Sequence, residues 1–294
     1  MSKSSSIGSI PKTDSYFGSL YMALAAVCFT AMGILTKQAG LKFAMHEYEL
    51  VFWRVLFATV VLGGQAVLMG RDFRTKHPKA HFWRSLAGSV SLLMFFFGIV
   101  HLPLATAITF SYTSSIFLAI FSMVLLKQMP NRLAWFALLI GLLGIVLILR
   151  PSILGFGLMP TLIGLTSGAI AGYAYLQVRE LSLLGEPSWR IVFYFSLLAS
   201  IVSAIGSSVV GWSAIRAEMI PYLLGIGATA MAGQLLMTYA YQVGRKFMVA
   251  ALSYLAVVLS TLYGVLWLDE SLPVMAMVGI GLVVLSGVLA GIKK

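Results

Sequence analysis

Ten apolar runs, each close to the length of a membrane-spanning helix, occupy most of this chain. They cover residues 16–35, 48–69, 82–100, 104–126, 133–148, 158–176, 191–212, 220–241, 247–268 and 273–292. A helix needs roughly 20 mainly apolar residues to cross the hydrocarbon core of a bilayer. Strands of a membrane barrel would instead alternate apolar and polar residues over about 10 positions. Such alternation is absent, so the runs predict an all-α integral membrane protein with ten transmembrane helices.

The charged residues support this interpretation and give it an orientation. Only 10% of the 294 residues are charged, against about 25% in soluble domains. The tails and loops on the side of the membrane where the amino terminus lies hold fifteen of the 20 Lys and Arg, with Arg84 counted among them. The opposite side holds four, and Arg54 lies inside the second run. Lys and Arg accumulate in cytoplasmic loops, so both termini are predicted to be cytoplasmic. The net charge of +11 then reflects topology, and no nucleic-acid partner is expected.

A repeat divides the chain into two halves. Ser111-Tyr112 recurs as Ser253-Tyr254, and the difference in residue number between the two pairs (253 minus 111), which we call the repeat offset, also separates Lys37 from Arg179. We interpret this as an internal duplication of five helices, covering 16–150 and 151–294, after a disordered cytoplasmic tail at 1–15. Because five is odd, the second copy is predicted to be inverted in the membrane. Inverted repeats place a binding site near the bilayer midplane, between the halves.

Four motifs resemble a known family over nearly the whole chain. They are Leu102-Pro103-Leu104-Ala105-Thr106-Ala107, Ser111-Tyr112-Thr113, Ala251-Leu252-Ser253-Tyr254-Leu255 and Asp269-Glu270-Ser271-Leu272. The chain resembles the ten-helix EamA-type branch of the drug/metabolite transporter superfamily, in which an arginine is also common at the position of Arg54. The basic loop 71–79 and the segment 81–86 are most similar to the S-adenosylmethionine uptake carriers. The resemblance implies a multi-pass carrier of small organic metabolites in the cytoplasmic (inner) membrane.

The chain departs from the family pattern in helices four and nine. Ser115 stands where a proline is usual, and Ala256-Val257 stands where many relatives have Glu-Pro. Losing both prolines predicts the loss of two helix kinks. Losing the glutamate removes a possible proton or cation ligand. The nine acidic residues and four histidines all lie in tails, loops or helix ends, which favours facilitated diffusion or exchange over a buried proton relay.

Polar and aromatic side chains near the helix centres are the candidate substrate ligands. The duplicated pair Tyr112 and Tyr254 could hold a flat or cationic ligand by stacking and cation–π attraction, or could simply pack between helices. Gln234 and Thr238, one turn apart, need polar partners in hydrocarbon and are expected to face a cavity or a neighbouring helix. By analogy with the family, whose pocket is lined by helices one, three, four, six, eight and nine, the remaining candidates are Phe29, Thr30 and Tyr173.

Arg54 is the one charge that this reading places well inside a helix. It is a candidate ligand for a substrate carboxylate, or one half of a gate ion pair with Glu47 or Glu49. The alternative is a structural arginine that pairs within the protein or extends to the outer interface.

No catalytic signature or metal-binding spacing is present, so neither an enzyme, a metal nor a cofactor is expected. The predicted function is alternating-access transport of a zwitterionic or cationic metabolite, similar to S-adenosylmethionine or an amino acid. Within transport, the alternative is an amino-acid or drug exporter. Outside transport, the alternatives are a membrane scaffold or accessory subunit and, more weakly, an ion channel. The chain is expected to be a monomer in the bilayer, or a homodimer through Gly287-x-x-x-Gly291.

Overall fold

The fold is known from a computed structural model that describes residues 15–101, 104–150, 157–267 and 273–292. Residues 1–14 of the predicted tail (1–15), the first two residues of the family motif at 102–107 and the family motif at 269–272 lie outside this part. The helices of the first half are α1 (Ser15–Phe43), α2 (Glu47–Leu68), α3 (Pro78–His101), α4 (Leu104–Tyr112), α5 (Ser114–Leu126) and α6 (Arg132–Leu149). Those of the second half are α7 (Leu158–Leu183), α8 (Ser188–Val210), η1 (Ala217–Met219), α9 (Ile220–Val243), α10 (Lys246–Leu252), α11 (Leu255–Trp267) and α12 (Val274–Gly291).

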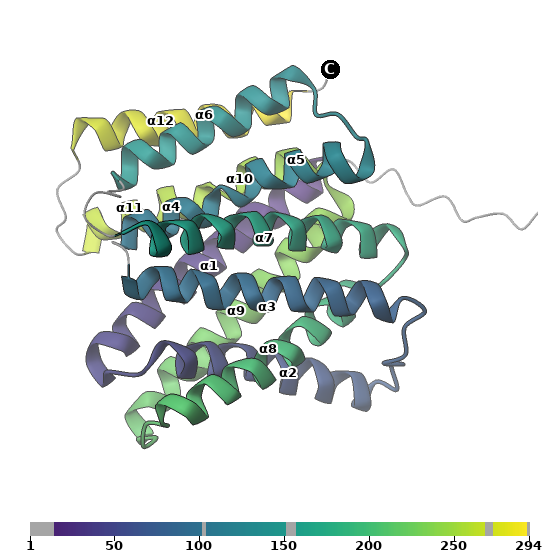
Figure 1. Cartoon of the computed structure of the whole chain (residues 1–294), viewed down its shortest axis with the longest axis vertical. Coiled ribbons are helices and arrows are strands. Elements are labelled where there is room, and N and C mark those ends of the chain that lie inside the picture. The colour runs from purple at the N-terminus through teal and green to yellow at the C-terminus, as the bar shows by residue number, and fades with distance from the viewer. Residues whose placement is uncertain (1–14, 102–103, 151–156, 268–272, 293–294) are drawn as a thin grey trace, which may run out of the picture.

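The helices form one bundle (Figure 1). α6 and α12 lie together at one end of its long axis, α2 and α8 lie at the other end, and α1, α3, α7 and α9 lie between them. The first turn of α1 and the last turn of α12 are on the same side of the bundle as the connection 70–77. That arrangement agrees with the predicted placement of both termini on one side of the membrane, while the cytoplasmic assignment of that side stays a prediction.

Helix bounds repeat along the chain with the offset found in the sequence. α9 begins and ends one repeat offset after α3 (220 minus 78 and 243 minus 101), and α12 follows α6 in the same way (274 minus 132 and 291 minus 149). Helix contacts repeat as well, because α1 packs on α9 as its counterpart α7 packs on α3. The self-corresponding pairs α2–α8 and α6–α12 also pack together. Contacts that survive exchange of the halves indicate a two-fold relation between them.

Eight segments of the described chain are long and apolar enough to cross a membrane. They correspond to α1, α2, the α4–α5 pair, α6, α8, α9 with η1, the α10–α11 pair and α12. An all-helical membrane protein is thereby confirmed. α3 and α7, which occupy central places in the bundle, would complete the ten spans, a count that stays a prediction.

Some helix bounds differ from the expected runs. α1 continues to Phe43 rather than 35, and α7 continues to Leu183 rather than 176. Lys and Arg extend their charged ends toward water while their aliphatic stems stay on apolar surface, so a charge does not end a membrane helix. The placement of Arg84 is also corrected, although this side chain does not reach water. α3 begins at Pro78, and Arg84 is a fully buried residue within this helix rather than part of a polar loop.

Helices four and nine are interrupted although they lack the family's prolines. Around both breaks the amide donates to the carbonyl three residues earlier: Thr113 to Phe110 at 3.1 Å, and Tyr254 to Ala251 at 3.2 Å. The hydroxyl of Thr113 also donates to the Phe110 carbonyl at 2.6 Å. Such back-bonding loosens and bends a helix. The helix hydrogen-bond pattern is therefore interrupted without the prolines, and the loss of the kinks stays a prediction.

Candidate functional site

The duplicated tyrosines meet each other at the seam between the halves. The rings of Tyr112 and Tyr254 lie edge to face with centroids 5.9 Å apart. Tyr254 is fully buried, and its hydroxyl lies 3.5 Å from the Leu138 carbonyl oxygen, at the long limit of a hydrogen bond. Tyr254 therefore packs between helices in this conformation, and its role as a ligand stays a prediction. We call this pair the tyrosine contact.

Hydroxyl groups close the same seam by donating to backbone carbonyls of the other half. Ser115 donates to Ala250 at 3.0 Å, and Ser286 donates to Ala137 at 2.7 Å. Thr30 of α1, a predicted ligand, donates to the Ala256 carbonyl of α11 at 3.3 Å. Its hydroxyl is thus engaged with the protein.

Two other predicted ligands also contact protein side chains. Phe29 packs on α9, where a Cβ added at Gly233 would lie 3.0 Å from its ring. Tyr173 accepts a hydrogen bond from Gln177 at 2.9 Å and meets Phe121 edge to face at 5.9 Å. Within the described part of the chain, neither residue interacts with Tyr112 or Tyr254, and their role as ligands stays a prediction.

A small polar cavity lies elsewhere between the halves. Arg54 and two apolar residues of α2 line it together with side chains of α8 and α9, its full lining being Arg54, Val55, Ala58, Phe195, Ser196, Ala230, Met231 and Gln234. Its volume is about 10 Å³, roughly the space for one water molecule. The structure therefore joins Arg54 and Gln234, two residues predicted separately, in one site.

A second arginine, which the sequence analysis did not single out, lies beside this cavity. The guanidinium carbon of Arg84 is 4.5 Å from the ring centroid of Phe195, a residue of the cavity wall. The phenol of Tyr175 is within electrostatic range of both Arg54 and Arg84. We call Arg54, Arg84, Phe195 and Gln234 the arginine cluster. The available signal for Arg84 was its position two residues inside the predicted run 82–100.

Neither guanidinium has a polar partner within the described residues. Arg84 is 2% exposed, and its Nε and Nη1 atoms are buried without a hydrogen bond. The three described ion pairs involve only His46, Glu47, His81, Glu186 and Arg190, so Arg54 forms none with Glu47 or Glu49. Instead, Glu49 is fully buried and accepts a hydrogen bond from the Ser213 amide at 3.2 Å. The predicted gate pair is not formed in this conformation, and its function stays a prediction.

Thr238, one turn beyond Gln234 on α9, adds another unsatisfied group. Its side chain is fully buried and its hydroxyl has no hydrogen-bond partner among the described residues. Buried polar groups in a membrane protein are costly unless they meet a polar partner. Thr238 does not line the cavity of Arg54 and Gln234, and its role as a ligand stays a prediction.

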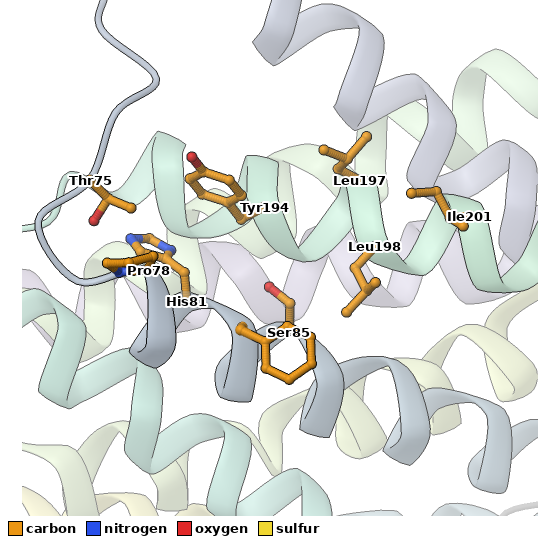
Figure 2. Close-up of a pocket in the computed structure, with 9 residues that line it drawn as sticks. Thr75, Pro78, His81, Ser85, Tyr194, Leu197, Leu198 and Ile201 are labelled. Atoms are coloured by element: carbon orange, nitrogen blue, oxygen red, sulfur yellow. The ribbon is translucent and has the colours of Figure 1, made fainter.

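A larger cavity of about 260 Å³ lies between the first part of α3 and α8 (Figure 2). His81 and Ser85 of α3 face Tyr194 and Leu198 of α8 across it, and Thr75 stands at one end. Its wall includes the exposed apolar residue Ile201. This cavity therefore opens beside lipid-facing side chains and is separate from the arginine cluster.

A polar network adjoins the end of that cavity. The carboxylate of Glu186 accepts hydrogen bonds from Thr75 and, at 2.7 Å, from Arg190, and it lies 3.3 Å from His81 Nε2. Burial by itself would raise the pKa of Glu186, but the hydrogen bonds from Thr75 and Arg190 and the neighbouring His81 imidazole outweigh it, and the pKa is lowered. Here an arginine has its counter-charge, unlike Arg54 and Arg84. Across the described residues, no three His, Cys, Asp or Glu side chains form a group that could hold a metal ion.

Known proteins resemble the chain over nearly its full length. It is 29% identical to an uncharacterized transporter of Helicobacter pylori over 93% of this chain and 94% of that protein. It is 28% identical to the pseudopaline exporter CntI of Pseudomonas aeruginosa, covering 86% and 88% of the two chains. The S-adenosylmethionine uptake transporter of Rickettsia bellii is 22% identical, with 82% of each chain covered.

A solved crystal structure has the same fold, with a TM-score of 0.79 at 21% identity over 95% of this chain and 97% of that one. The EamA-like transporter family matches the sequence twice, at residues 16–150 and 158–292. Those two matches are one repeat offset apart at each end (158 minus 16 and 292 minus 150), as the helices are. The chain is a multi-pass protein of the cytoplasmic membrane and belongs to the EamA-like transporter family of small-metabolite carriers.

Proposed function

We propose that this protein moves an amino-acid-like or S-adenosylmethionine-like zwitterion across the cytoplasmic membrane by alternating access. The names of two relatives support the substrate class, since one takes up S-adenosylmethionine and the other exports pseudopaline. Because these relatives work in opposite directions, they do not favour import over export. Absence of a deep carboxylate in the sequence favours exchange or facilitated diffusion over proton coupling.

One observation carries the proposal: the arginine cluster lies between the two halves. Arg54 and Arg84 belong to α2 and α3 of the first half, and Phe195 and Gln234 belong to α8 and α9 of the second. Inverted-repeat carriers bind their substrate at this kind of interface and expose it by rocking one half against the other. A scaffold or accessory subunit would gain nothing from unpaired charges at an internal seam.

The size of the cavity indicates what must move. A volume of about 10 Å³ admits one water and excludes any metabolite, so this conformation holds the site closed. Opening requires α2 to separate from α8 and α9, the three helices whose residues line the cavity. The inverted orientation of the second half, and the cytoplasmic location of both termini, are part of this proposal.

The test is uptake of radiolabelled metabolites into proteoliposomes, with and without a pH gradient. The panel contains S-adenosylmethionine, amino acids and their amine analogues. We expect saturable uptake of at least one zwitterion and little change when a proton gradient is imposed.

A blocking variant distinguishes carrier-mediated flux from leakage. Ala58→Phe places a ring in the cavity wall and is expected to abolish uptake. Val60→Phe, on the same helix at a 63% exposed position, adds the same ring on the exposed surface of α2 and is expected to leave uptake intact. Equal uptake by the wild type, Ala58→Phe and empty liposomes across the panel would contradict the proposal.

A further inference from the structure

We propose that Arg54 and Arg84 bind the carboxylate of the transported metabolite, so that a substrate must carry an anionic group. This inference rests on the proposed transport function and narrows its substrate class. It follows from the partners that each arginine has, and from what the rest of the cluster can offer.

The other buried or half-buried arginines of the bundle are engaged with the protein. Arg179 donates to the Tyr241 and Gln242 carbonyls at 2.6 and 2.7 Å, at the carboxyl end of α9. Arg245 donates to the Ala290 carbonyl at 2.6 Å, and Arg190 pairs with Glu186. These arginines stabilise helix ends or a loop. Arg54 and Arg84 have no such structural role in the described part of the chain.

The surroundings of Arg84 compensate its charge only in part. The Phe195 ring at 4.5 Å provides a cation–π contact, and the nearby Tyr175 phenol is a neutral dipole. A charged group removed from water needs a hydrogen-bonded counter-charge to be stable. None is present within the described residues, so two cations beside one cavity leave room for an anion. A guanidinium presents a planar fork of N–H donors that matches the two oxygens of a carboxylate.

The two arginines of the cluster have no charged counterpart in the second repeat. One repeat offset after Arg54 the chain has Ser196, and one repeat offset after Arg84 it has Ile226. Gln234 likewise corresponds to Leu92 of the first half. The charged members of the cluster are therefore not repeated in the second half, and Ser196, the uncharged counterpart of Arg54, lines the same cavity as Arg54. Loss of symmetry at this one cluster is expected if it recognises an asymmetric ligand, in which the carboxylate has a defined place.

This assignment decides between the charge classes predicted from the sequence. A purely cationic metabolite would be repelled by two guanidinium groups at short range. A zwitterion can place its carboxylate on the arginines and its cationic end toward uncharged polar groups such as Gln234 and Tyr175. Monocarboxylates and dicarboxylates fit for the same reason.

The experiment compares matched pairs that differ in a carboxylate. Purified full-length protein in detergent is melted with methionine or 3-(methylsulfanyl)propylamine, and with S-adenosylmethionine or its decarboxylated form. Inorganic phosphate is added as a second anion. The same compounds are then tested for uptake in proteoliposomes. We expect the carboxylates, but not the amines, to raise the melting temperature and to be transported, while a response to phosphate alone would assign the site to phosphate esters and overturn the carboxylate assignment.

Variants locate the effect. Arg84→Met and Arg54→Met are expected to weaken carboxylate binding at least about tenfold, because each removes one partner of a buried charge pair. Arg84→Met should not lower the melting temperature of the ligand-free protein, since the side chain it replaces has no polar partner. Arg179→Met, the matched control, should lower the melting temperature and keep the preference for carboxylates.

The outcomes separate this inference from the transport proposal. Equal transport of an amine and its carboxylate partner by the wild type would overturn the anion site and leave the carrier standing. Wild-type affinity for carboxylates in both arginine variants would do the same. The wild-type comparison of matched pairs holds even if neither variant folds. A wild type that neither binds nor transports any of the carboxylates overturns the inference, and flux of another solute would then still support a carrier.

Discussion

The tyrosine contact and the arginine cluster both lie where the two halves meet, but they differ in how their polar groups are satisfied. Around the tyrosine contact, hydroxyls reach backbone carbonyls across the seam, as Ser115 does to Ala250 and Ser286 does to Ala137. In the arginine cluster, Arg84 has buried nitrogen atoms without partners. The first region satisfies its polar groups within the protein, and the second keeps unpartnered groups, as expected of the proposed carboxylate site.

The difference follows the duplication. Tyr112 and Tyr254 are counterparts and still contact each other, as expected for residues at the axis of a two-fold relation. Arg54 and Arg84 have lost their counterparts, which are Ser196 and Ile226. We therefore attribute the preserved tyrosine pair to packing of the two halves. The arginines without a charged counterpart, which lie beside the cavity, are attributed to recognition of a ligand. The predictions below test this contrast through stability, in order of expected effect.

Tyr254→Ala should be the most destabilising of these changes. Its side chain is fully buried against Gly141, where an added Cβ would lie 2.4 Å from the ring. Truncating a large buried aromatic costs roughly 3–5 kcal/mol because a cavity remains. We expect little monodisperse protein after size-exclusion chromatography in detergent.

Tyr254→Phe is the matched control. It keeps the ring and removes only a hydroxyl whose hydrogen bond to Leu138 is long, at 3.5 Å, so it should fold and transport. A Tyr254→Ala protein that folds normally but has lost transport would break the contrast, because this tyrosine would then belong to the binding site. Tyr112→Ala, at the half-buried partner, separates the two roles considered for this tyrosine: equal loss of folded protein and of transport would make it packing, and loss of transport alone would make it a ligand and break the contrast.

Gly141→Val tests the same packing from the opposite helix. The new Cβ would lie 2.4 Å from Tyr254 Cδ2 and 2.5 Å from Ser286 Oγ. Overpacking of this kind typically costs about 1–3 kcal/mol. Gly281→Val on α12 has no atom within 4 Å of the new Cβ and serves as the control. Equal melting temperatures for the two variants would mean that the seam is loosely packed.

Fold and duplication were accessible from the sequence because apolar length and a repeated offset are one-dimensional signals. The bounds of α3 and α9 are separated by that offset, as are those of α6 and α12. Side-chain facing was not accessible. Membrane helices are apolar on several faces, so periodicity does not say whether Phe29 or Thr30 points to a cavity. Arg84 was missed because its charge resembles that of the neighbouring basic loop.

The Glu186→Gln variant removes the counter-charge of a paired arginine, Arg190, and so gives a comparison with the unpaired Arg54 and Arg84. Replacing the carboxylate leaves Arg190 without its counter-charge, and a buried group that loses its partner costs about 1–3 kcal/mol. The lowered pKa of Glu186 sets the pH dependence. Its stabilisation is complete above the ordinary value of 4.5 and is lost as the pH falls through the lower value in the folded protein.

The measurement is the melting temperature of the wild type and the variant between pH 7 and pH 3. The melting temperature of the wild type should exceed that of the variant at pH 7. This difference should shrink below about pH 4.5, so that the two melting temperatures converge at low pH. A constant difference at all pH values would mean that the carboxylate is not ionised in the folded protein. The difference in melting temperature between the wild type and Arg84→Met, by contrast, should not change with pH, since this variant keeps Glu186.

Ser115→Pro should have the smallest effect, although a proline inside a membrane helix is usually disruptive. Ser115 is the second residue of α5, and its amide donates no backbone hydrogen bond within the described chain. Proline is accepted in the first turn of a helix because the amide there has no partner. The variant restores the residue usual in the family and loses the hydroxyl bond to the Ala250 carbonyl, together with the contact of that hydroxyl with the Tyr254 side chain, at a cost of about 1 kcal/mol. Ser115→Ala, which loses that same bond, should match it in melting temperature. A proline variant with a melting temperature far below that of the alanine variant would show that the Ser115 amide makes a hydrogen bond that stabilises the start of α5. The hydroxyl bonds would then not be the only polar contacts that hold this seam together.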